Sequence, residues 1–140
     1  MTQRAGHKNV TVWVDVPDKP LWVRLPEDAI RQILHNVLRN AVDASPPGAQ
    51  VTVRVDTTLP LRILVSDVGP GIPPHLRDRV FKPFFTTKTS NSEPGMGLGL
   101  SVCHGLMEAI GGKIDFQCGE VSGITFKIHL PSDGLTKEES

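Results

Sequence analysis

The chain has 140 residues, the length of one domain that can bury about two thirds of the surface its unfolded form exposes. Its 15 Lys and Arg balance 15 Asp and Glu, so no excess of either charge would recruit nucleic acid or an anionic membrane. Cys103 and Cys118 form no metal-spaced cluster and fit a reducing compartment, with Cys103 as a small core residue. We find no secretory signal and no apolar run long enough to span a bilayer.

The first 26 residues predict a disordered tail followed by two strands. Residues 1–9 show no periodic pattern, so we expect them to be disordered. Residues 10–16 alternate as a strand, and 21–24 are expected to be its hairpin partner. A long helix should then begin at Pro26, because proline favours the first helical turn.

This helix should carry a polar stripe beside its apolar face and end before Pro46. At about 100° per residue, Asn36, Asn40 and Asp43 fall close together on a helical wheel. The adjoining arc is apolar and consists of Ile30, Ile33, Leu34, Val37, Leu38 and Ala41. The third arc suits water and holds Arg31, His35 and Arg39. Taken alone, this pattern is equally typical of an amphipathic helix with solvated asparagines.

The rest of the chain predicts a mixed sheet with one further long helix. Strands are expected at 51–55, 61–65, 113–117 and 123–130, and helical segments at 74–81 and 97–110. The connection between residues 69 and 95 is long, which is typical of a functional loop, and we interpret it as a lid hinged on glycine. Residues 132–140 look like a polar tail. The pattern favours a two-layer α/β sandwich, with helices on one face of the sheet.

Three motifs follow the polar helix in order. Asp67 ends a strand and leads into a tight turn at Gly69 and Gly71. Residues 81–88 form an aromatic and basic cluster that includes Phe81, Phe84, Phe85 and Lys88. Gly95, Gly97 and Gly99 then precede the second helix. These glycines do not fit the dinucleotide fingerprint, and the lysine of a phosphate-binding P-loop is missing.

Together, the polar helix and the three motifs resemble the N, G1, F and G2 boxes of the histidine protein kinase catalytic domain. The resemblance extends from Pro26 to Pro131. That family shares its nucleotide-binding fold with DNA gyrase, heat-shock chaperone and mismatch-repair ATPases. It implies a Bergerat-type ATP-binding domain over residues 10–131, a mixed sheet with helices on one face and a flexible ATP lid.

The resemblance also implies roles for particular residues. Asn36, Asn40 and Lys88 would be catalytic, with Asn40 as the Mg²⁺ ligand. Asp67 would recognise the adenine amine, and Thr125 would lie near it. The other residues implied to bind ATP are Asp43, Gly69, Gly71, Ile72, Phe84, Gly95, Gly97, Leu98, Gly99, Leu100 and Ser101. Met96 departs from the threonine often found between the first two glycines of the G2 box, which removes one hydroxyl contact.

These residue types suit the chemistry. A buried carboxylate at Asp67 can accept a hydrogen bond from adenine but would face the carbonyl oxygen of guanine, and an unpaired buried acceptor costs about 1–3 kcal/mol. Mg²⁺ prefers hard oxygen ligands, such as the amide oxygen of Asn40 and phosphate oxygens. The glycines let backbone N–H groups approach phosphates at a helix N-terminus. Lys88 can supply a cation, although a solvated lysine would look the same in sequence.

The function implied is transfer of the γ-phosphoryl group of ATP to a histidine on a separate dimerisation domain. Gyrase-type relatives carry a glutamate one turn before the metal-binding asparagine, where this chain has Asn36. An amide cannot accept the proton of water, which favours transfer over hydrolysis. Two alternatives stay open: an anti-sigma-factor serine kinase of the same fold, and an ATP-binding module without catalysis. The aromatic segment 81–88 favours the histidine kinase.

The partners follow from what the chain lacks. Phosphoacceptor histidines are typically followed by an acidic residue, and none of the five histidines has one: His7, His35, His75, His104 and His129. We therefore expect the acceptor on a separate dimerisation domain, a response regulator downstream, and an isolated domain that is monomeric and contacts neither nucleic acid nor membrane. A domain that uses ATP is expected in the cytoplasm. A membrane anchor elsewhere in a longer parent protein is compatible with that location.

Overall fold

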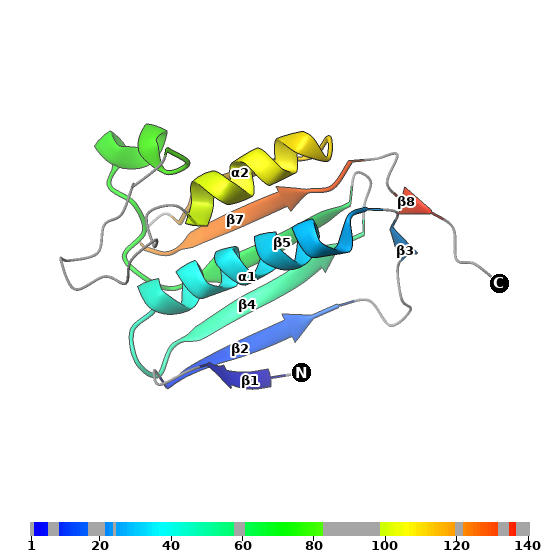
Figure 1. Ribbon diagram of the computed structural model, residues 1–140. Helices are drawn as coiled ribbons and strands as arrows, with labels where there is room; N and C mark the ends of the chain where they lie inside the picture. The colour runs from blue at the N-terminus through cyan, green and yellow to red at the C-terminus, as the bar shows by residue number, and fades with distance from the viewer. Residues whose placement is uncertain are drawn as a thin grey trace.

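The chain folds into two layers, a six-stranded mixed sheet with helices on one face (Figure 1). This computed structural model describes residues 2–5, 9–16, 22–23, 25–57, 61–82, 99–119, 122–131 and 135–136. The strands are β1 (Thr2–Ala5), β2 (Val10–Asp15), β3 (Trp22–Val23), β4 (Gln50–Asp56), β5 (Arg62–Asp67), β6 (Lys113–Cys118), β7 (Ile124–His129) and β8 (Leu135–Thr136). The helices are α1 (Glu27–Ala44), the short 3-10 helix η1 (Pro74–Arg79) and α2 (Gly99–Ala109). The predicted two-layer α/β fold is confirmed.

The main sheet has the order β1-β2-β4-β5-β7-β6. β2 and β4 are parallel, and every other neighbouring pair is antiparallel. β5 and β7 are antiparallel, and Asp67 pairs with Ile124. The C-terminal end of β5 and the N-terminal end of β7 therefore lie at the same end of the sheet. The end of α1 and the start of α2 lie at this same end of the sheet (Figure 1). The topology therefore gathers the predicted motifs at one end of the molecule.

Helix α1 has the boundaries and the buried face that the sequence predicts. Pro26 precedes its first turn, and Ile33, Val37 and Ala41 are fully buried against the sheet. The helix stops at Ser45, whose backbone is extended and whose hydroxyl donates a hydrogen bond to the Ala41 carbonyl at 2.8 Å. Because the next residue is Pro46, the helix cannot continue without the proline ring meeting the preceding turn.

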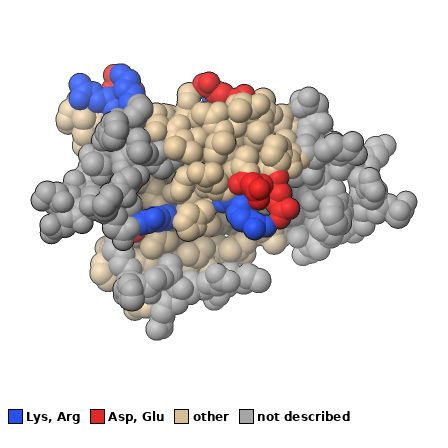
Figure 2. Space-filling view, viewed as in Figure 1, with Lys and Arg blue, Asp and Glu red and all other residues tan. Residues whose placement is uncertain are grey.

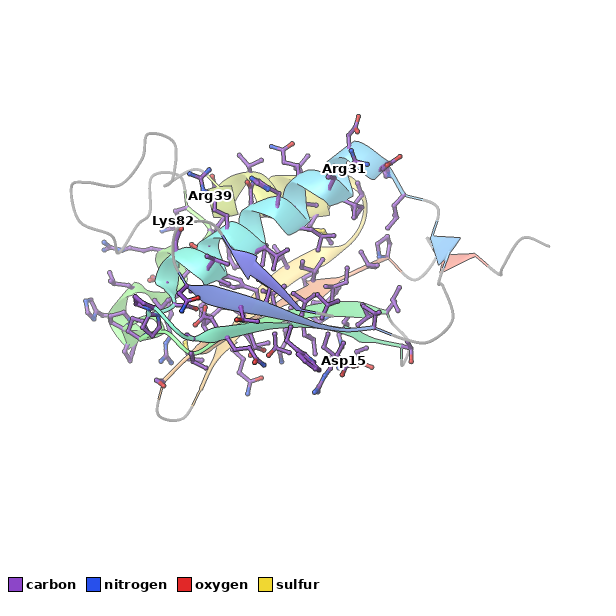
Figure 3. The ribbon with its side chains drawn as sticks, turned by 90° about the horizontal axis from the view of Figure 1, so that it is seen from below. Asp15, Arg31, Arg39 and Lys82 are labelled. Atoms are coloured by element: carbon purple, nitrogen blue, oxygen red, sulfur yellow. The ribbon has the colours of Figure 1, made fainter. Side chains whose placement is uncertain are left out.

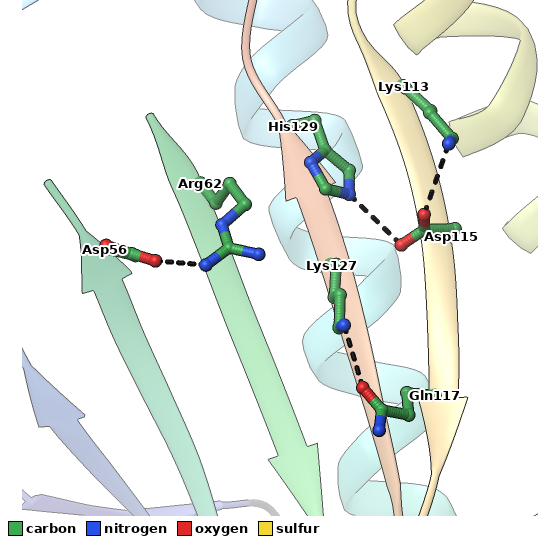
Figure 4. Close-up of polar contacts among 7 residues, drawn as sticks. All are labelled: Asp56, Arg62, Lys113, Asp115, Gln117, Lys127 and His129. Atoms are coloured by element: carbon green, nitrogen blue, oxygen red, sulfur yellow. Dashed lines mark hydrogen bonds and ion pairs between the residues drawn. The ribbon is translucent and has the colours of Figure 1, made fainter. Parts of the chain in front are cut away.

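The sheet alternates between an apolar inner face and a polar outer face. In β7, Ile124, Phe126 and Ile128 are buried beneath the helices, while Lys127 and His129 lie on the other face. The outer face is crossed by polar contacts, which join Arg62 to Asp56, His129 and Lys113 to Asp115, and Lys127 to Gln117 (Figure 4). The period of two in side-chain direction explains why the core lies on one side only.

Two expectations for the ends of the chain were wrong. Residues 22–23 do not form a hairpin with β2; they pair with β8, because both edges of β2 are already taken by β1 and β4. The predicted disordered tail 1–9 contains β1. The short strand β8 lies within the segment 132–140, which was expected only to be polar. The two-stranded sheet formed by β3 and β8 lies at the end of the molecule opposite the gathered motifs (Figure 1). No helix among the described residues is long and apolar enough to cross a membrane.

Candidate functional site

The most unusual polar group of the described residues is the carboxyl of Asp67, at the end of β5. Its side chain is buried, and the residue is only 6% exposed. Oδ1 accepts a hydrogen bond from the Gly69 backbone N–H at 2.9 Å, whereas Oδ2 is buried without a hydrogen-bond partner among the described residues. Burial raises the pKa of this carboxyl, and hydrogen bonds from the backbone at Gly69 and Ile124 oppose the shift. A ligand that offers an N–H donor would satisfy the remaining oxygen.

The turn after Asp67 is held in place by three glycines. The N–H of Gly123 donates to the Gly69 carbonyl at 2.7 Å, which ties the turn to the start of β7. Gly71 and Gly123 have φ of 77° and 88°, a region that favours glycine. At Gly69, a β-carbon would lie 2.4 Å from the Ala44 carbonyl oxygen at the end of α1. The turn therefore packs directly against the helix that carries the polar stripe.

Gly123 is a site residue that the motifs did not predict. Its only signal in the sequence is its position directly before the last long strand, and that position does not indicate its contact with Gly69. A β-carbon at Gly123 would lie 2.6 Å from the Asp67 carbonyl oxygen. The backbone that positions Asp67 is thus made by residues more than 50 positions apart in the sequence.

The expected place of Thr125 beside the Asp67 side chain was wrong. In the register of β5 and β7, Thr125 pairs with Ser66 and its hydroxyl is 2.8 Å from the Ser66 hydroxyl. Successive side chains of a strand point to opposite faces, so this pair lies on the face away from Asp67. The residue that pairs with Asp67 is Ile124, which is buried. An apolar side chain therefore stands where a hydroxyl was expected.

On α1, the predicted polar stripe contributes the two amide side chains of Asn36 and Asn40. Asn36 and Asn40 are both half-buried. The side chain of Asn36 hydrogen-bonds the buried thiol of Cys103 on α2, and the Cys103 Sγ also lies 3.6 Å from the Ile33 carbonyl oxygen. Asn36 is therefore part of the contact between the two helices. Cys103 is fully buried, which confirms its predicted place in the core.

Asp43, the third member of the stripe, is paired within its own helix. Its Oδ2 lies 3.9 Å from the Nε of Arg39, one turn earlier, and both side chains are partly exposed. This residue was expected near the phosphates of ATP, where a carboxylate is an unusual neighbour. Arg39 was assigned to the solvent-facing arc, so the pairing of the two was not predicted.

The predicted motifs after Asp67 are only partly described. Ile72 is half-buried against the core, and its carbonyl accepts a hydrogen bond from the Arg77 Nε at 3.0 Å. An open pocket follows the turn and is lined by Pro70, Gly71, Ile72, Pro73, Pro74, Leu76 and Arg77. Helix α2 is described from Gly99; Leu100 packs against the core and Ser101 is half-buried. Five predicted site residues lie outside the described residues: Phe84, Lys88, Gly95, Gly97 and Leu98.

Phe81, the first aromatic residue of the 81–88 segment, connects that segment to the core. Its ring stacks on the His104 ring of α2 with centroids 5.3 Å apart. It also contacts Phe116 and Phe126 of the sheet, at centroid distances of 5.9 and 6.4 Å. The aromatic contacts anchor a point within the segment expected to form the lid.

On the face of the molecule shown in Figure 2, the charges of the described residues form no field of one sign. On the face in Figure 2, basic and acidic side chains occur in small groups separated by uncharged residues. This distribution agrees with the equal numbers of acidic and basic residues in the sequence. Anion binding at the site would therefore depend on local groups rather than on the overall charge.

The comparison with known families matches most of the chain. Residues 26–134 match the family described as histidine kinase-, DNA gyrase B-, and HSP90-like ATPase. This range coincides closely with the span from Pro26 to Pro131 over which the motifs resemble a histidine kinase. It also includes every element that contributes to the candidate site.

Curated relatives are sensor kinases. The chain is 37% identical over 134 residues to the C4-dicarboxylate transport sensor protein DctB of Pseudomonas aeruginosa, covering 93% of this chain and 22% of DctB. It is also 37% identical over 142 residues to the sensory histidine kinase/phosphatase NtrB of Salmonella typhimurium, covering 86% of this chain and 39% of NtrB. The chain thus spans about a fifth to two fifths of the length of these relatives.

Solved structures of histidine kinases share the fold. The solved chain of a mycobacterial sensor histidine kinase, MprB, superposes with a TM-score of 0.75 at 33% identity, covering 87% of this chain and 83% of that solved chain. Full-length ShkA in complex with AMPPNP superposes at 0.79 with 27% identity, covering 98% of this chain and 28% of ShkA. Histidine kinase ThkA in complex with response regulator protein TrrA superposes at 0.72 with 29% identity, covering 89% of this chain and 34% of ThkA.

Proposed function

Since the chain belongs to the family of histidine kinase-, DNA gyrase B-, and HSP90-like ATPases, we propose that it is the catalytic domain of a two-component sensor histidine kinase. It binds Mg-ATP and transfers the γ-phosphoryl group to a histidine on a separate dimerisation domain. Its relatives are sensor kinases, and one similar structure is a complex with AMPPNP. The active domain acts in the cytoplasm, where ATP is available.

The observation that carries this proposal is the buried, half-satisfied carboxyl of Asp67. Leaving a buried acceptor without a partner costs about 1–3 kcal/mol. An unsatisfied buried acceptor in a folded protein therefore indicates a functional role, such as binding a ligand that donates a hydrogen bond. The exocyclic amine of adenine supplies the donor that Oδ2 lacks. The guanine carbonyl would place an acceptor against an acceptor, so ATP is preferred to GTP.

The polar residues of α1 would hold the metal and the phosphates. Asn40 offers a half-buried amide oxygen on the helix that packs against the turn after Asp67. Such an oxygen fits the hard-ligand preference of Mg²⁺, which neutralises charge on the phosphates when bound. The start of α2 at Gly99 would add backbone N–H donors, and Lys88 a further cation.

Asn36 explains why transfer is favoured over hydrolysis. Its amide has no basic lone pair that could take a proton from water, and it is engaged by the Cys103 thiol. The domain therefore keeps its nucleotide intact until an acceptor histidine arrives. A response regulator receives the phosphoryl group afterwards, a proposal supported by the complex of ThkA with TrrA.

The proposal is tested by incubating the chain with Mg-ATP and candidate helical hairpins that carry an acceptor histidine. We expect slow hydrolysis by the chain alone, no self-labelling, and an acid-labile, alkali-tolerant phosphoramidate on the cognate hairpin. Acid-stable phosphoserine on a protein partner would instead assign the chain to the anti-sigma kinases. Rapid partner-free turnover would contradict both assignments. ATP binding without any transfer would leave a non-catalytic module.

A further inference from the structure

The ion pair between Arg39 and Asp43 borders the polar stripe of α1. At about 100° per residue, Asp43 lies roughly 20° from Asn36 around the helix axis, and Arg39 roughly 60° in the same direction. Both belong to the last two turns of α1, the part of the helix that contacts the turn after Asp67. The pair is therefore at the rim of the candidate site and not on the far side of the helix.

A carboxylate at this place is unfavourable for binding a triphosphate. Asp43 and the phosphates both carry negative charge, and like charges at short range repel each other. Arg39 offsets part of the charge of Asp43, with Nε and Oδ2 3.9 Å apart. Any phosphate that approached Asp43 would meet the guanidinium at the same time.

The geometry of the pair leaves Arg39 able to bind a second anion. At 3.9 Å the contact is an ion pair longer than a hydrogen bond, and it is partly exposed, so rearranging it costs little. A guanidinium has five N–H donors in a planar fork that matches phosphate oxygens. In Figure 3, Arg39 projects from the C-terminal half of α1, and Arg31 projects near the opposite end of the helix.

We propose that Arg39 binds the phosphates of ATP and that Asp43 is its positioning residue, not a phosphate or metal ligand. This inference rests on the proposed function, because it concerns the same nucleotide. The attraction of Asp43 favours positions of the guanidinium on this side of the helix over positions that point away from the site. It assigns to Arg39 a role that the sequence motifs do not indicate.

The central test compares Arg39→Gln with Arg31→Gln. The control arginine lies on the same helix and forms an i,i+4 pair with Glu27, but its side chain is 73% exposed and far along the helix. With excess Mg²⁺, Arg39→Gln should weaken ATP binding at least tenfold, which corresponds to about 1.4 kcal/mol. Adenosine binding should stay within twofold, and Arg31→Gln should bind both ligands like the parent.

Salt dependence and the magnesium response separate direct contact from a structural effect. ATP affinity of Arg39→Gln should fall less steeply with salt than that of the parent, because one charge contact is missing. The enhancement of ATP affinity by Mg²⁺ should be unchanged, since Arg39 is not a ligand of the metal. Equal losses for ATP and adenosine in Arg39→Gln would overturn the proposal.

Asp43→Asn tests the positioning role. The variant should lose about two- to threefold in ATP affinity, because the guanidinium is no longer held toward the phosphates, and it should keep the response to Mg²⁺. An ATP affinity equal to that of the parent would contradict the positioning role. In the Arg39→Gln background Asp43→Asn should cause no further loss, because Asp43 acts through Arg39. An Asp43→Asn variant without a magnesium response would make Asp43 a metal ligand and contradict the proposal.

The outcomes also separate this proposal from the assigned function. A folded parent chain that binds neither ATP nor adenosine would contradict the proposed function itself. A parent that binds ATP, together with an Arg39→Gln variant that binds it equally well, would contradict only the role of Arg39.

Discussion

The Oδ1 atom of Asp67 accepts a hydrogen bond from the backbone N–H of Gly69 at 2.9 Å, while Oδ2 of the same carboxyl is buried without a partner among the described residues. The bond joins the last residue of β5 to the turn that packs under Ala44 of α1. The orientation of the carboxyl is therefore set by the backbone before any ligand binds. A preorganised acceptor gives affinity and base specificity at a low cost in conformational entropy.

The first prediction concerns base recognition by Asp67. Asp67→Asn keeps the size of the side chain but places an amide where an acceptor is needed. ATP affinity should fall at least tenfold, about 1.4 kcal/mol, because one oxygen no longer accepts from adenine. Isothermal titration with ATP measures the loss, and circular dichroism verifies the fold. An unchanged ATP affinity in a folded variant would show that Asp67 does not contact the base.

The second prediction concerns the pH dependence of stability. Burial raises the pKa of Asp67 above its ordinary value of 3.8, so the folded state holds this proton to a higher pH than the unfolded state does. As pH rises from 3.8 through the raised pKa, this group lowers the free energy of unfolding of the parent. The Asp67→Asn variant has no carboxyl to ionise at this position, so its free energy of unfolding does not fall for this reason. The variant should therefore gain stability relative to the parent as pH rises to neutral. Urea unfolding of both proteins between pH 3.5 and 7 tests this; a difference independent of pH would contradict it.

The third prediction uses two glycines with different surroundings. Gly69→Ala would bring a methyl group to 2.4 Å from the Ala44 carbonyl oxygen, and relieving such a clash should cost about 1–3 kcal/mol. Gly105→Ala, in α2, meets no atom within 4 Å and should stabilise the protein by about 0.5–1 kcal/mol, because alanine favours a helix. Thermal unfolding of both variants gives the two signs. Similar effects at the two positions would mean that the turn does not pack tightly against α1.

Local patterns in the sequence were sufficient for the long helix and the central strands. Pro26 and Pro46 mark the start and the end of α1. The helical period of its apolar residues predicted that Ile33, Val37 and Ala41 lie on the buried face. Residues 123–130 were likewise expected to form a strand, which is observed as β7 (Ile124–His129). These features depend on neighbours in the chain, so periodicity and turn chemistry determine them.

The parts that sequence patterns missed depend on how distant elements meet. The register of β5 and β7 places Ile124, not Thr125, opposite Asp67, and a shift of one residue reverses the face of a side chain. The bond from Gly123 to Gly69 and the contact of Asn36 with Cys103 also join distant segments. The pairing of β3 with β8 joins residues 22–23 to residues 135–136. Periodicity indicates which face of an element is buried, but not which faces are in contact.

The fourth prediction concerns the metal. Asn40→Ala removes the amide oxygen proposed to bind Mg²⁺, so the increase in ATP affinity caused by Mg²⁺ should largely disappear. Adenosine binding depends on Asp67, so the affinity of the variant for adenosine should stay within about threefold of that of the parent. Titrations of ATP with and without Mg²⁺ measure the response. If Mg²⁺ strengthens ATP binding equally in the variant and the parent, Asn40 is not the ligand.

The last prediction concerns the two cysteines. Cys103 is fully buried, and burial raises the pKa of its thiol to about 11, against the opposing effect of the hydrogen bond with Asn36. At pH 8 only about one Cys103 thiol in a thousand is then ionised, and the thiolate is the form that alkylating reagents attack. Cys118 is only half-buried, at the end of β6.

Iodoacetamide should therefore modify Cys118 first in the folded protein and both cysteines in urea, as read by peptide mass spectrometry. A Cys118→Ser variant should take up no label until it unfolds, and rapid labelling of that variant under native conditions would contradict the buried contact between Cys103 and Asn36.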